Sequence, residues 1–89
     1  MKIFMVAVIF GKVVMTVGPV PSSIDTCKHQ AALQESDWDR AWSERNLDES
    51  DATIVEGRRV RRADIHAFCV ESDVRPPLGS DYAAKRSAS

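Results

Sequence analysis

The uneven distribution of apolar residues constrains the fold of this chain more than any other feature. Residues 3–20 are almost wholly apolar, whereas the rest of the 89-residue chain is polar with scattered apolar positions. Lys2 precedes the apolar stretch, and a segment rich in Gly, Pro and Ser follows it. A charged start, an apolar stretch and a helix-breaking exit of small residues are the anatomy of a secretory signal. We therefore expect residues 1–22 to be a signal peptide.

Lys12 lies inside the apolar stretch, where a signal peptide seldom carries a charge, and it leaves two alternatives open. In the first, Lys2–Phe10 and Val13–Val17 are β-strands of a hairpin with a type II′ turn at Gly11-Lys12, which suits their β-branched content. In the second, the stretch is a retained membrane anchor. Spanning a bilayer takes about 20 apolar residues, and a central lysine would cost about 3 kcal/mol.

The two cysteines, Cys27 and Cys69, both follow the apolar stretch. An even number of cysteines in a short exported chain favours a disulfide. Without residues 1–22 the chain is close to the size at which a core alone no longer stabilises a fold. A Cys27–Cys69 bond would close a loop of about 42 residues and contribute about 4 kcal/mol in the chain-entropy model.

The segment 23–78 is expected to form one small domain, with 79–89 as a flexible tail. Apolar or small residues recur every three to four positions from Cys27 to Trp42, which predicts a helix from Ile24 to about Asn46. An acidic connector follows, then a β-prone run at 52–56 and a turn at Gly57. Residues 64–71 alternate in polarity and are expected to form a strand paired with 52–56. A helix over 64–71 is the alternative.

These elements predict an α+β fold in which one long helix packs on a short two-stranded antiparallel ribbon, held by a single disulfide. The helix must cover the ribbon, because a lone hairpin is only marginally stable in water. The candidate core residues are Trp38, Trp42, Leu47, Ile54, Val60, Ile65 and Phe68.

Four arginines stand close together after Gly57: Arg58, Arg59, Arg61 and Arg62. Such a run can bind phosphate through bidentate contacts. No aromatic residue is interleaved and no nucleic-acid-binding motif surrounds the run. The acidic residues within 35–51 offer partners in the same chain, so we expect a solvated turn and no nucleic-acid partner. Contact with another protein is a further possibility for these arginines.

Cys27, His29, His66 and Cys69 make up a possible zinc ligand set of two thiolates and two imidazoles. The site requires 64–71 to be helical, because a strand would point His66 and Cys69 to opposite faces. A disulfide with two surface histidines is the preferred interpretation, and we expect no metal and no other cofactor.

Asp64, His66 and Ser72 lie close in sequence, but no motif for nucleophilic catalysis surrounds them. We therefore expect no catalytic residues and no enzymatic activity. Trp38 and Trp42 are four positions apart and share one helix face. Such a pair usually belongs to a core, yet one of them could serve as an exposed anchor for a partner.

In layout, the chain resembles small uncharacterised exported proteins of bacteria and their phages. The resemblance consists of an apolar address at Met1–Pro21, one cysteine that opens a helix, and a second cysteine within Cys69–Pro76. It implies export and a disulfide, and it implies no activity. We therefore expect a secreted or periplasmic, non-enzymatic protein that binds another protein or an envelope component.

Two other classes of function stay open. A cytosolic interaction or nucleic-acid-binding module would use residues 1–18 as a hairpin and the Arg58–Arg62 run as its contact. A small zinc-stabilised module would use the two cysteines and two histidines. Membrane contact is expected only through residues 1–20, if they are not cleaved.

Overall fold

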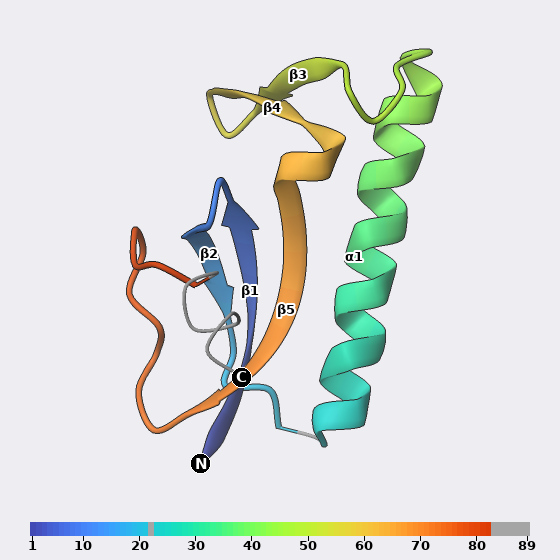
Figure 1. Cartoon of the computed structure of the whole chain (residues 1–89). Coiled ribbons are helices and arrows are strands. Elements are labelled where there is room, and N and C mark those ends of the chain that lie inside the picture. The colour runs from blue at the N-terminus through green and yellow to red at the C-terminus, as the bar shows by residue number, and fades with distance from the viewer. Residues whose placement is uncertain (22, 83–89) are drawn as a thin grey trace.

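The computed structural model describes residues 1–21 and 23–82. Its elements in chain order are β1 (Lys2–Ile9), β2 (Lys12–Val17), α1 (Ile24–Glu44), β3 (Ala52–Val55), β4 (Arg58–Arg61), the 3₁₀ turn η1 (Arg62–Asp64) and β5 (Ile65–Ser72) (Figure 1). The fold is α+β, as predicted, with one long helix and antiparallel sheets in the described part of the chain. The way in which the strands pair differs from the prediction.

The apolar opening stretch is the centre of the fold. β1 lies between β2 and β5 in a three-stranded antiparallel sheet. Its residues from Val6 to Ile9 are all buried. In the full chain, the stretch expected to be a separate segment up to residue 22 thus lies in the same sheet as β5. A strand buried on both faces is apolar throughout rather than alternating, and for this reason it resembles a signal sequence.

The hairpin alternative describes residues 2–17 correctly, except for its turn. The two-residue loop is Phe10-Gly11, because Ile9 pairs with Lys12. Both loop residues have positive φ, 53° for Phe10 and 78° for Gly11. Positive φ at both positions is the requirement of a type I′ turn, not the type II′ turn expected at Gly11-Lys12.

β5 is a strand, as preferred, but its expected partner was wrong. It pairs along its whole length with β1, from Ile65 opposite Ile9 to Ser72 opposite Lys2. β3 pairs with β4 in a separate hairpin that turns at Glu56-Gly57. The two strands of the predicted ribbon therefore belong to different sheets. β5 pairs with β1 because β1 is a longer apolar strand than β3.

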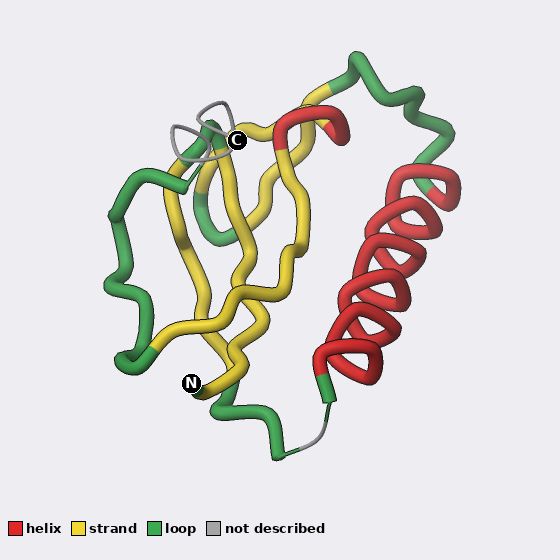
Figure 2. Tube along the Cα trace, turned by 60° about the horizontal axis from the view of Figure 1, so that its bottom comes forward, coloured by secondary structure: helices red, strands yellow, loops and turns green. Residues whose placement is uncertain are grey.

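The helix α1 begins and ends close to the predicted positions. The Ser23 hydroxyl accepts a hydrogen bond from the Thr26 backbone N–H and caps the first turn. At the other end Asn46 adopts a positive φ of 58°, and the Leu47 N–H bonds back to the Trp42 carbonyl. α1 packs against β5 and β1, so β2 is left outside its main contacts (Figure 2).

Two apolar clusters lie on the two faces of the sheet. On the helix side, Ile9 and Ile65 pack with Trp42 and Val60. Three of these residues, Ile65, Trp42 and Val60, were predicted as core, and their burial confirms that prediction. Trp38 and Leu47 contact this cluster and are partly buried. Phe68 contacts the second cluster, which lies on the opposite face of the sheet. The prediction of Ile54 as a core residue was wrong.

Ile54 is 59% exposed, because β3 and β4 form a narrow ribbon with only one buried face.

Residues 73–82 run along the outer edge of β2 (Figure 1), and Tyr82 at the end of this segment packs on the face of the sheet opposite α1. Tyr82 is buried against Val6, Val8 and Val13, and its ring stacks on Phe68 with centroids 4.7 Å apart. The expected tail at 79–89 was therefore wrong for 79–82, and residues 83–89 lie outside the described part. No helix in the described residues is long and apolar enough to cross a membrane.

Candidate protein-binding surface

The disulfide joins Cys27 in the first turn of α1 to Cys69 in β5, with Cα atoms 6.0 Å apart. Cys27 is fully buried. This pairing confirms the predicted staple, although it links the helix to the three-stranded sheet rather than to a ribbon.

The zinc alternative loses its thiolates, because both sulfurs belong to the disulfide. His29 is exposed on α1, and His66 faces the Ala63 carbonyl and Glu35. Within residues 1–21 and 23–82, no three His, Cys, Asp or Glu side chains are grouped for a metal ion. The structure therefore does not bring the four proposed ligands together.

The arginine run is divided by the strand geometry of β4. Arg61 forms a bidentate pair with Asp64, and this hydrogen-bonded ion pair lowers the pKa of the Asp64 carboxyl. Arg62 turns toward α1. Arg58 and Arg59 are exposed, and neither has an ion pair within the described residues. Two of the four arginines are thus committed to the fold, and two are available to a partner.

Arg62 connects three parts of the molecule. Its guanidinium, only 11% exposed, donates to Glu35 and Asp39 on α1 and to the Ile65 carbonyl, and it lies 5.8 Å from the Trp38 ring. Burial lowers the pKa of Arg62, but the hydrogen bonds to the two carboxylates outweigh it, and the net pKa is raised.

Glu35 is the other half of this connection; the acidic residues within 35–51 were expected to pair with the arginine run, although Glu35 was not singled out among them. One carboxylate oxygen accepts from Arg62, and the other accepts from the Ala67 N–H on the outer edge of β5. The cluster fixes α1 to β5, so its role is structural.

We expect Glu35→Gln to destabilise the protein by about 2 kcal/mol, because a largely buried guanidinium loses one of its two carboxylates. Urea unfolding followed by tryptophan fluorescence measures this change. Asp37→Asn is the matched control, since it removes an exposed ion pair with Arg40 on the same helix. Exposed ion pairs stabilise a fold by about 0–1 kcal/mol, so this substitution should lower the free energy of unfolding by less than about 0.5 kcal/mol. Equal effects of the two substitutions would contradict the structural role of Glu35.

Neither tryptophan is placed as an exposed anchor. Trp42 is 3% exposed, and its indole N–H donates to the Asp51 carbonyl at 2.9 Å. Trp38 is partly buried beneath Arg62. Both belong to the junction between α1 and the β3–β4 hairpin, where they act as core residues.

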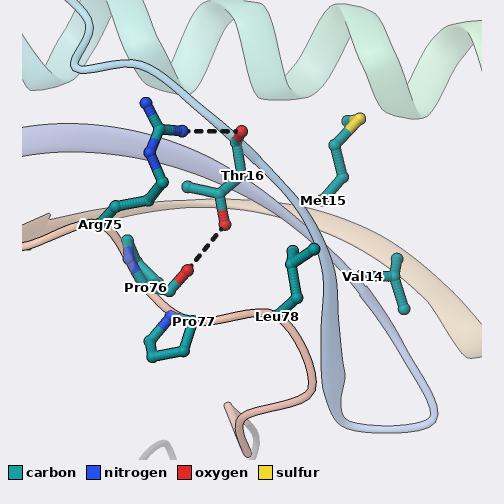
Figure 3. Close-up of a pocket in the computed structure, with 7 residues that line it drawn as sticks. All are labelled: Val14, Met15, Thr16, Arg75, Pro76, Pro77 and Leu78. Atoms are coloured by element: carbon teal, nitrogen blue, oxygen red, sulfur yellow. Dashed lines mark hydrogen bonds between the residues drawn. The ribbon is translucent and has the colours of Figure 1, made fainter.

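The outer edge of β2 carries two adjoining depressions. The first, of about 410 Å³, lies between β2 and residues 75–78 (Figure 3). At one end Thr16 donates to the Pro76 carbonyl, and Arg75 donates to the Thr16 carbonyl. At the other end, backbone hydrogen bonds join Val13 to Gly79 and Ser80. The first depression lies between these two sets of bonds.

A β-bulge shapes this edge. The register between β1 and β2 shifts at Ala7/Val8, so Val13 pairs with Val8, Met15 pairs with Ala7, and Val14 is the extra residue. A bulge redirects side chains and interrupts strict alternation. Val13 is buried, whereas Val14 lines both depressions.

The second depression, of about 460 Å³, continues from the first at Val14 and Leu78. Ile9 and Val13 are the buried residues that line it, and the exposed residues Phe10, Arg58 and Leu78 come from three distant segments. Leu78 is 69% exposed and Phe10 58% exposed. We call the two depressions together the β2-edge groove.

The Phe10 backbone is in an unfavourable conformation for its residue type. A bulky residue at positive φ costs about 1–2 kcal/mol, and type I′ turns usually place Asn or Asp before the glycine. The Phe10 side chain is 58% exposed at this position. Residues held under strain and exposed tend to mark functional surfaces.

Comparison with known proteins gives this surface no precedent: no family model, no curated protein and no solved structure matches the chain. Sequence reasoning missed Phe10 and Leu78. The signals available were a phenylalanine directly before a turn glycine and a leucine directly after two prolines.

Proposed function

We propose that this protein is a non-enzymatic binding module that holds a segment of another protein in the β2-edge groove. The observation that carries the proposal is the convergence of Phe10, Leu78 and Arg58 around one open depression with an apolar base. Exposed apolar residues gathered at a pocket mark interaction sites, and arginine is enriched among the residues that contribute most to binding energy.

We also propose that the module acts in an oxidising compartment, secreted or periplasmic. The support is the Cys27–Cys69 disulfide, which persists in such compartments and is rare in a reducing cytosol. The working form keeps residues 2–17, because they supply the central strand and one edge strand of the sheet.

Binding of displayed random peptides to the full oxidised chain tests the proposed function. Phe10→Asn and Leu78→Ser should each weaken the selected peptides about tenfold, the usual effect of removing an anchor worth about 1–2 kcal/mol. Phe10→Asn should leave the fold intact or slightly more stable, because Asn suits the first position of a type I′ turn. Lost binding would then not be due to unfolding.

Leu33→Ser is the matched control, because Leu33 is an exposed leucine, 47% accessible, on α1 and does not line the groove. It should bind the selected peptides as the wild type does. The proposed function would be rejected if peptides were selected and Leu33→Ser weakened them as much as Phe10→Asn, or if no peptide were selected at all.

A further inference from the structure

The charged residues that line the β2-edge groove all have the same sign. Its lining residues include Lys12, Arg58 and Arg75, and none of the lining residues in the described part is Asp or Glu. The chain as a whole carries a formal net charge of −1. The groove is therefore positive against the average of the molecule.

Only one of these three cations is neutralised by a carboxylate. Lys12 forms an ion pair with Asp81. Arg75 donates to the Thr16 and Gly18 carbonyls and lies 5.6 Å from the Phe4 ring, which are neutral groups. Arg58 forms no ion pair within residues 1–21 and 23–82, and Glu56, two positions before it, is not bonded to it.

We infer that the segment held in the groove is acidic as well as apolar, and that Arg58 determines this specificity. The inference rests on the proposed function. An apolar side chain of the partner would lie between the exposed side chains of Phe10 and Leu78. A carboxylate close to it in the partner's sequence would pair with Arg58 at the rim, where an ion pair sets specificity more than affinity.

The test uses peptides selected from a random displayed library on the full oxidised chain. We expect enrichment of Asp or Glu within a few residues of Leu, Phe or Trp. Dissociation constants are then measured by fluorescence anisotropy for each acidic peptide and for its Asn or Gln counterpart. The acidic form should bind more tightly, and the difference should shrink as salt is raised to about 0.3 M.

Arg58→Gln should weaken the acidic peptides about threefold, as expected for an exposed ion pair, and Arg58→Glu about tenfold. Neither variant should change the affinity for the neutral counterparts by a comparable factor. Arg45→Glu is the matched control, because Arg45 is exposed at the end of α1, does not line the groove and has no ion pair in the described part.

Two results would overturn the inference in distinguishable ways. If peptides bind, lose affinity in Phe10→Asn, but show no preference for acids and no response to Arg58→Glu, the proposed function stands and the acidic specificity fails. If no peptide is selected, both proposals fail; sedimentation with phosphatidylglycerol vesicles that is lost in Arg58→Glu would then assign the groove to an anionic lipid.

Discussion

Removal of Met1–Pro21 is expected to unfold the remaining chain. These residues contribute β1 and β2, and six of the thirteen apolar residues that are buried in the described part of the chain lie among them: Phe4, Val6, Ala7, Val8, Ile9 and Val13. Without β1, β5 loses the one strand that it pairs with among residues 1–21 and 23–82, and the apolar face beneath α1 is exposed. We expect the truncated chain to show no cooperative thermal transition and no near-ultraviolet circular dichroism, because no fixed core is left.

A cut made after folding gives a sharper form of this experiment. A protease site in the connector between β2 and α1 separates the two fragments covalently, since the Cys27–Cys69 bond lies entirely on the second fragment. The two fragments should still co-elute in size-exclusion chromatography and separate only in denaturant. A cooperative unfolding transition of the second fragment alone would contradict the central role of β1 and would favour an N-terminal segment that is removed in the working protein.

Loss of the disulfide is expected to have the second largest effect. In the chain-entropy model a loop of about 42 residues is worth about 4 kcal/mol, against a total stability of about 5–15 kcal/mol for an ordinary domain. The double substitution Cys27→Ala and Cys69→Ala, or reduction of the wild type, should therefore lower the Tm by about 20 °C. Calorimetry with and without reductant measures the change.

The effect should be concentrated in the first half of α1. Only Cys27 and Ala31 are buried there, whereas Trp42 anchors the second half. Amide hydrogen exchange after reduction should therefore rise most over the first half of α1 and least around Trp42. Reductant should leave the double-alanine variant unchanged. An unchanged Tm on reduction of the wild type would show that packing alone holds the helix to the sheet.

Local patterns were sufficient wherever a residue's neighbours in sequence decide its structure. The three- to four-residue recurrence over 24–44 predicted α1, because one helix face meets the sheet. The alternation over 64–71 predicted β5, because its residues alternate between two faces of a sheet. The pairing of two cysteines followed from their number.

These local patterns could not predict the candidate site. Phe10, Arg58 and Leu78 are far apart in sequence and meet only because β1 turns back beside residues 78–79 and the β3–β4 hairpin lies near that turn. The arginine run was expected to form a solvated turn that pairs with the acidic residues of 35–51. The ion pairs of Arg62 with Glu35 and Asp39 agree with that expectation, whereas the burial of Arg62 was not expected. β4 ends at Arg61, and η1 begins at Arg62. Arg62 therefore faces α1 rather than solvent, because Glu35 on that helix, distant in sequence, lies within reach of its guanidinium.

Local residue patterns are enough to predict a helix, β-prone segments and a cysteine pair able to join them. Which strand is central depends on the packing of the whole chain, since an unbroken apolar run has the same appearance whether it is buried in a membrane, a translocation channel or a sheet. That distinction depends on the surface the run meets. Here the surface is made by β2, β5, α1 and Tyr82, which together bury β1 from Val6 to Ile9.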